Sequence, residues 1–97
     1  MNLNLYSIFD RKMNVYLTPF PARGDVDAKR QVSASFADAG IKSTPAGQHP
    51  EDFDLVKIGM FDDETGVVSR VEVPLVLANL EYLRNLAAEK AAAQLPS

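Results

Sequence analysis

The chain lacks several features that would point to a particular class of protein. It contains no cysteine, which excludes disulfides, thiolate metal ligands and cysteine nucleophiles. No stretch approaches the run of about 18 apolar residues that a membrane-spanning helix needs. Its first residues also lack the basic region, apolar core and small-residue cleavage site of a secretory signal. We therefore expect a protein of the cytoplasm with no membrane attachment.

An excess of positive charge is also missing. The chain has 10 lysines and arginines against 13 acidic residues, for a formal net charge of −3. This balance does not supply the broad positive field of a general nucleic-acid binder. A local patch remains open, because five basic residues fall in the first thirty: Arg11, Lys12, Arg23, Lys29 and Arg30. The other interpretation is ordinary solvated surface charge.

Motifs of catalysis are absent as well. The five glycines never cluster, so the chain has no P-loop, dinucleotide fingerprint or nucleophile elbow. The single histidine, His49, lies between proline and glycine residues with no visible partner for general-base chemistry. The acidic stretch at 62–66 lacks the length and spacing of an EF-hand and is typical of a hairpin turn. We expect no enzyme activity, no cofactor and no bound metal.

The composition is that of a folded globular protein. Hydrophobic residues make up 46% of the chain and charged residues 24%, near the globular average. A chain of 97 residues is long enough for one core and too short for a second. We predict a single domain over residues 1–97.

The first half predicts a hairpin and a helix. Alternating side chains over 3–9 and 15–20, with a polar reversal at 10–13, are typical of paired strands that end at Pro19 and Pro21. After Gly24, Asp25 is a candidate N-cap for a helix of about 14 residues that ends with Gly40 in a left-handed C′ position. Its buried stripe is predicted to be Ala28, Val32, Phe36 and Ala39.

The second half of the chain predicts a loop, then a second hairpin followed by a helix. Residues 41–50 carry two prolines and a glycine without periodicity and favour a surface loop. Strands are predicted over 53–61 and 67–73, joined by a turn in which Gly66 takes a positive φ. Pro74 fits the first turn of a final helix, over about 75–93. The buried stripe of this helix is predicted to be Val76, Leu80, Leu83, Leu86, Ala87 and Ala91.

The predicted fold class is therefore α+β, in the order β-β-α-β-β-α, with an antiparallel sheet of two hairpins and two helices packed on it. The first and third strands carry apolar side chains on both faces, whereas a sheet with one wet face alternates cleanly. We expect the second face to be covered, either by the second helix or by another copy of the chain.

Aromatic and basic residues interleave on the first hairpin. Such an arrangement stacks unpaired bases and neutralises phosphates in many proteins. The alternative is that most of these rings belong to the core. The candidate nucleic-acid-binding residues are Tyr6, Arg11, Lys12, Tyr16, Arg23, Lys29 and Arg30.

Three blocks of sequence carry a family resemblance. They are residues 5–12 (LYSIFDRK), Pro19-Phe20 leading to 25–30, and residues 50–66 (PEDFDLVKIGMFDDETG). In this order they resemble the small non-structural protein of gokushovirus-like microviruses, which are tailless phages with single-stranded DNA genomes. The similarity covers about residues 5–72 and leaves out the last predicted helix.

The resemblance implies an intracellular viral protein, absent from the virion, that carries a DNA-binding label and acts in genome replication or packaging. It brings no catalytic motif with it, so no residue is assigned to an active site. Two classes of function follow. One is a module that binds single-stranded DNA, in which an oligomer would combine the weak basic patches of its subunits into one binding track. The other is an oligomeric module that contacts phage or host replication and packaging proteins and does not touch DNA.

Overall fold

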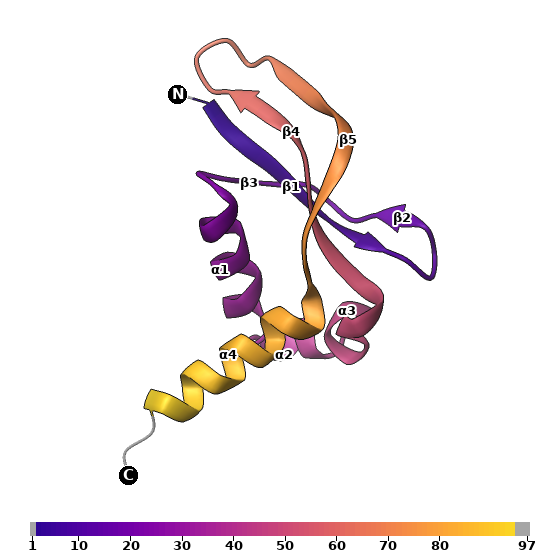
Figure 1. The fold of residues 1–97 in the computed structure, drawn as a ribbon, viewed down its shortest axis with the longest axis vertical. Coiled ribbons are helices and arrows are strands. Elements are labelled where there is room, and N and C mark those ends of the chain that lie inside the picture. Colours follow the sequence, from indigo (N-terminus) through magenta and orange to yellow (C-terminus); the bar gives the residue numbers. More distant parts are fainter. Residues whose placement is uncertain (1, 95–97) are drawn as a thin grey trace.

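The computed structural model describes residues 2–94, with side chains described as far as Glu89, and shows one sheet with helices packed against it (Figure 1). Its elements are β1 (Asn2–Asp10), β2 (Val15–Tyr16), β3 (Phe20–Ala22), α1 (Asp25–Ser35), α2 (Ala39–Lys42), α3 (Pro45–Gln48), the 3-10 turn η1 (Pro50–Asp52), β4 (Phe53–Asp62), β5 (Val68–Asn79) and α4 (Leu80–Gln94). None of these helices is long and apolar enough to cross a membrane.

The sheet has five strands and is antiparallel, which confirms the predicted α+β class. Its order is β2-β1-β4-β5, and β3 also pairs with β1. The central pairing joins β1 to β4 along its whole length, from Asn2 opposite Asp62 to Asp10 opposite Phe53. The simple order β-β-α-β-β-α is not what the structure has, because short elements interrupt both halves of the chain.

The chain reverses after β1 in a tight polar turn. The Asp10 carboxylate accepts hydrogen bonds from the backbone N–H groups of Lys12 and Met13, at 2.9 and 3.0 Å. Asn14 completes the turn with φ 59°, a left-handed conformation that asparagine tolerates. Pro21 does not end the pairing as predicted, since it lies inside β3, an edge strand, where a missing N–H costs little.

Helix α1 is shorter than predicted and capped differently. Gly24 is its N-cap, and Asp25 instead accepts a hydrogen bond from the Tyr6 hydroxyl at 2.7 Å. The helix ends after Ser35, because Asp38 caps a new helix by accepting the N–H of Gly40 at 2.7 Å. The predicted left-handed conformation at Gly40 is therefore wrong, and Ala39 is exposed rather than buried.

The segment predicted as a surface loop folds into α2, α3 and η1. Thr44 caps α3 by accepting the N–H of Gly47 at 3.1 Å, and Pro45 occupies the first helical position. Threonine followed by proline is a recognised start of a helix, so this prediction was wrong for a reason visible in the sequence.

The last helix begins six residues later than Pro74. Four residues of β5, at 71–74, face the single residue Ile58 of β4, so Pro74 lies in a bulge of an edge strand. The Asn79 side chain then caps α4, because its oxygen accepts the Glu81 N–H at 3.0 Å while its amide donates to the Phe53 carbonyl. The strand therefore continues to Asn79 and includes Val76, so the predicted helix start was wrong.

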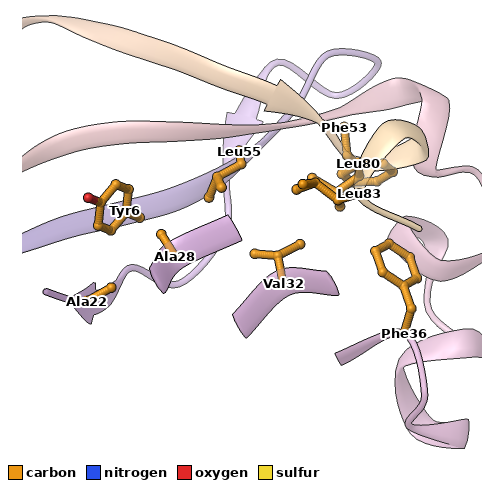
Figure 2. Packing of buried hydrophobic residues seen from close by; sticks show 9 residues of the cluster. All are labelled: Tyr6, Ala22, Ala28, Val32, Phe36, Phe53, Leu55, Leu80 and Leu83. Carbon is orange, nitrogen blue, oxygen red and sulfur yellow. The ribbon is translucent and has the colours of Figure 1, made fainter. Parts of the chain in front are cut away.

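The core forms between one face of the sheet and helices α1 and α4, as Figure 2 shows. The predicted stripe of α1 is confirmed at its first three positions, and that of α4 at Leu80 and Leu83. Leu86 is 39% exposed and Val76, on β5, is 60% exposed, so neither belongs to the core. Ala91 lies outside the described side chains. The buried residues of this core cluster are Tyr6, Ala22, Ala28, Val32, Phe36, Phe53, Leu55, Leu80 and Leu83.

Candidate functional site

One face of the sheet receives no core side chain from any helix of residues 2–94. Tyr6 and Ile8 of β1 lie on the side of the helices, so alternation along the strand points Leu3, Leu5, Ser7 and Phe9 to the other side. Directly opposed residues of paired strands share a face. This side, the open face, carries four cross-strand rows: Leu3, Phe61 and Val68; Leu5, Gly59 and Arg70; Ser7, Val56 and Val76; and Phe9, Tyr16, Asp54 and Asn79.

The open face is largely apolar. Val68 is 65% exposed, and Leu3, Leu5 and Phe61 are partly exposed, whereas Ser7 and Val56 in the third row are buried. A contiguous exposed apolar surface marks an interaction site more often than isolated apolar residues do. The expectation that the second helix covers this face is wrong, because α4 packs beside α1 on the opposite side of the sheet.

At the end of the open face next to the β1–β2 turn, aromatic and basic side chains come together. The rings of Phe9 and Tyr16 lie with centroids 4.7 Å apart, and Tyr16 is 50% exposed. Arg11 follows β1 directly; its Nε lies 3.2 Å from an Asp54 carboxylate oxygen, and its guanidinium also donates to the Glu51 carbonyl. Lys12 is exposed on the turn. We call Phe9, Arg11, Lys12 and Tyr16 the hairpin-tip site.

The chemistry of the hairpin-tip site suits an unpaired nucleotide. A half-exposed ring beside a second ring, tilted by 45° to it, offers a flat surface for a base, and adjacent cations can meet a phosphate. Asp54 already neutralises part of the charge of Arg11, which leaves Lys12 as the more available cation. Sequence reasoning placed Arg11, Lys12 and Tyr16 together correctly, and it treated Phe9 only as one of the hairpin aromatics.

The other predicted basic residues lie elsewhere. Arg23 follows Ala22, which pairs with Asn4, whereas the hairpin tip follows Asp10. Six residues along a strand span about 20 Å. Lys29 and Arg30 lie on α1, which starts from this distant end of β3 (Figure 1). The basic residues of the first thirty therefore form two groups rather than one track.

Tyr6 belongs to the core and not to the surface. Its side chain is fully buried, and its hydroxyl donates to Asp25 at 2.7 Å and accepts from the Asn4 amide at 3.2 Å. Burial, and then the hydrogen bond to Asp25, raise the pKa of Tyr6 to about 12. A ring in this position cannot stack on a base, so Tyr6 drops out of the candidate site.

Tyr6→Phe is expected to reduce the loss of stability at alkaline pH. The folded-state pKa of about 12 lies above the unfolded value of 10.0, so neutral Tyr6 stabilises the fold fully below pH 10. That contribution disappears as the pH rises from about 10 through about 12. Urea denaturation at about pH 9 and pH 11.5 should therefore show a larger drop in unfolding free energy for the unmodified chain. Equal drops in both proteins would contradict this assignment.

His49 and the acidic turn both lie on the surface of the protein. His49 Nδ1 lies 3.5 Å from Glu51 on an exposed surface. The pKa of Glu51 is lowered, chiefly by a hydrogen bond from its own backbone and, against the opposing effect of burial, by His49. The predicted turn at 62–66 is confirmed, with Gly66 at φ 75°. Among the described residues no three His, Cys, Asp or Glu side chains are grouped to hold a metal ion.

A pocket of about 400 Å³, which sequence reasoning missed, lies on the helix side of the sheet. Its apolar lining includes Ile8, Phe20, Val32, Phe36, Ile41 and Ala46. The hydroxyls of Ser35 and Thr44 in its wall donate to backbone carbonyls of Val32 and Ile41. The sequence did not predict this pocket because residues 41–46, which form part of its wall, were expected to lie in an irregular loop.

Comparison with known proteins identifies a family. A family model described as Phage ORF5 protein matches residues 3–83, which include the open face, the hairpin-tip site and the first residues of α4. No curated protein and no solved structure matches the chain.

Proposed function

Since the chain belongs to the Phage ORF5 protein family, we propose that it is a non-structural protein of a gokushovirus-like microvirus that binds single-stranded DNA during genome replication or packaging. The three sequence blocks at 5–12, 19–30 and 50–66 support the microvirus assignment. The hairpin-tip site supports the choice of ligand.

One observation carries this proposal: a half-exposed aromatic ring lies on a sheet face with cations next to it. The Tyr16 ring contacts that of Phe9, with centroids 4.7 Å apart, and half of the Tyr16 side chain stays exposed to solvent. Stacking of bases on such rings tolerates any sequence, because every base has a flat face. A single strand exposes its bases, whereas a duplex hides them, and the site therefore favours single strands.

The charge of the protein limits the electrostatic part of this binding. Two cations flank the site, one of them paired with Asp54, and the chain as a whole carries a net charge of −3. For single strands the logarithm of affinity falls against the logarithm of salt with a slope of about −0.7 per phosphate engaged. We expect one or two phosphates per subunit, and hence a shallow slope and weak binding by each copy.

The first test replaces the cations. A labelled oligothymidine is titrated at several salt concentrations with the unmodified chain and with R11A/K12A. The double variant should flatten the salt slope by about 0.7 to 1.4. The matched control is K29A/R30A, which removes the same charge from α1 and should leave the slope nearly unchanged. Equal effects of the two variants would remove the hairpin tip as the site.

The second test removes the stacking ring. Tyr16→Ala should weaken binding to the oligothymidine by about 1–3 kcal/mol, the usual contribution of one stacked base. Tyr82→Ala is the control, because Tyr82 is similarly exposed, at 57%, on α4 and away from the open face. If both variants bind like the unmodified chain, Tyr16 does not stack on a base.

A second candidate function rests on the apolar rows of the open face. Leucine, valine and phenylalanine side chains of 3, 5, 61, 68 and 76 suit a protein partner as well as a nucleic acid. In this alternative the chain is an oligomeric interaction module that contacts phage or host replication and packaging proteins without touching DNA. Absence of binding to both single- and double-stranded DNA at low salt, where charges are least screened, would favour it.

A further inference from the structure

The outer edge of β5 is free along the projecting end of the sheet. β5 is the last strand in the order β2-β1-β4-β5, and Figure 1 shows no described strand beyond it. Val73 is 75% exposed, and nearly every side chain from Val68 to Val76 is exposed. A long, apolar edge strand with unpaired backbone groups is a template for pairing with another strand.

The backbone of this edge offers hydrogen bonds at defined positions. The Asp62 N–H donates to the Val67 carbonyl at 2.9 Å and the Gly66 N–H donates to the Asp62 carbonyl at 2.8 Å, so hydrogen bonds close the turn next to the first pair of the β4–β5 ladder. Hydrogen-bonded and non-bonded pairs alternate in antiparallel strands. In the register that follows, Phe61 opposite Val68 and Gly59 opposite Arg70 are non-bonded pairs. The N–H and C=O groups of Val68 and Arg70 therefore point away from β4, toward the free edge.

We propose that this edge pairs with β5 of a second copy of the chain, antiparallel and symmetric about Val71. In this register Arg70 lies opposite Glu72 of the second copy, and Glu72 lies opposite Arg70 of the second copy. A symmetric interface makes each contact twice. Residues 71–74 form the bulge of β5 and pair with no residue of β4, so the backbone of Glu72, like that of Arg70, is not used in the β4–β5 ladder.

Charge selects this register over its neighbours. An axis at Arg70 would place two arginines opposite each other, and an axis at Glu72 would place two glutamates opposite each other. Like charges directly opposite in a sheet are destabilising, whereas opposite charges stabilise. In the described part of the chain neither the Arg70 nor the Glu72 side chain has an ion pair or hydrogen bond. Both are available for a second copy.

Pro74 limits the length of the pairing. In the same register Pro74 lies opposite Val68 of the second copy, and it has no N–H to donate. The ladder therefore weakens beyond Val68 and Pro74 on each side. Two copies joined in this way leave no β5 edge free, which ends the assembly at a dimer.

The dimer has a consequence for the proposed function, and this part of the inference rests on it. A two-fold axis perpendicular to the sheet keeps both open faces on the same side. One continuous surface then carries two hairpin-tip sites, so two weak contacts act on one strand of DNA. The dimer itself does not require DNA.

Sedimentation equilibrium without DNA tests the dimer. The unmodified chain should dimerise, and R70E and E72R should each raise the dissociation constant about tenfold or more, because both charged pairs become repulsive. An equimolar mixture of R70E and E72R should form a heterodimer as tight as the original, since each glutamate then meets an arginine. The double variant R70E/E72R should also recover. Arg30→Glu, the same charge change on α1, should have little effect.

Three outcomes would overturn the proposal. They are a monomer at several hundred micromolar, a dimer that tolerates both single reversals, and a mixture of the two reversals that stays monomeric. Circular dichroism of each variant shows whether it folds, and the mixture reports on pairing even if one reversal alone is poorly stable. Since no DNA is present, these results are independent of the titrations of the hairpin-tip site.

Discussion

Leu83→Ala is expected to lower the free energy of unfolding by about 2–5 kcal/mol. Leu83 is fully buried between the sheet and α1, in one cluster with Leu55 and Val32 (Figure 2). Truncation removes apolar contacts and leaves a cavity that rigid strands on one side cannot fill. Chemical denaturation monitored by circular dichroism measures the change, as a lower midpoint at an unchanged slope.

The control for this prediction is Leu86→Ala, one turn further along the same helix. Leu86 is 39% exposed and outside the core cluster, so its truncation should cost well under half as much as that of Leu83. A denaturation midpoint insensitive to Leu83→Ala, or equally sensitive at both positions, would show that α4 does not pack as described.

Gly59→Ala should destabilise the protein by about 1–3 kcal/mol, although alanine adds one methyl group. Gly59 lies in β4 next to the irregular pairing with β5, and a Cβ there would clash with the backbone carbonyl oxygen of Ser69. A backbone atom in a sheet cannot rotate away as a side chain would. The two strands must therefore separate locally, and the free edge of β5 would shift with them.

Gly24→Ala is the matched control. A Cβ added at Gly24 would meet no heavy atom within 4 Å, and the extended backbone of this residue, at φ −171°, is open to any residue type. The same chemical change should therefore cost less than at Gly59, about 0.5 kcal/mol, which is the loss expected from alanine at an N-cap. Thermal or urea unfolding of both variants measures the two changes in unfolding free energy. Equal losses in the two variants would contradict the close approach of β5 to Gly59.

Local patterns predicted the parts of the fold that depend on neighbouring residues. Three- and four-residue spacing identified Ala28, Val32 and Phe36 as buried, and the alternation of apolar residues identified β1 and β4. The turn with Gly66 also followed from residue types. The pairing of β1 with β4 did not, because it joins residues about 50 positions apart and depends on packing of the whole sheet.

Two wrong helix boundaries were predicted from the positions that proline and glycine most often occupy in helices. Pro74 commonly starts a helix, yet here a bulge in an edge strand accommodates it, and Asn79 supplies the cap. Gly40 commonly ends a helix, yet the carboxylate of Asp38 starts another one at that point. In both cases a polar side chain within a few residues, Asn79 or Asp38, caps a helix at a position that the proline or glycine alone does not predict.

The candidate site was predictable only where its residues are neighbours in the chain. Arg11, Lys12 and Tyr16 flank one turn, so any hairpin brings them together. Tyr6 and Arg23 were grouped with them because sequence does not show which face the helices cover or how far apart two ends of a strand lie. Those facts decide that Tyr6 is in the core and that Arg23 is about 20 Å from the turn.

The most direct test of the account is a map of amide chemical shifts during addition of a short oligothymidine at low salt. We predict that the largest shifts fall on the hairpin tip, from Phe9 to Tyr16, and on Asp54 across the sheet from them. Amides of the core of α1, such as Val32, should change little. Shifts centred on Lys29 and Arg30, or none at any position, would contradict the claim that the open face binds single-stranded DNA at its hairpin tip.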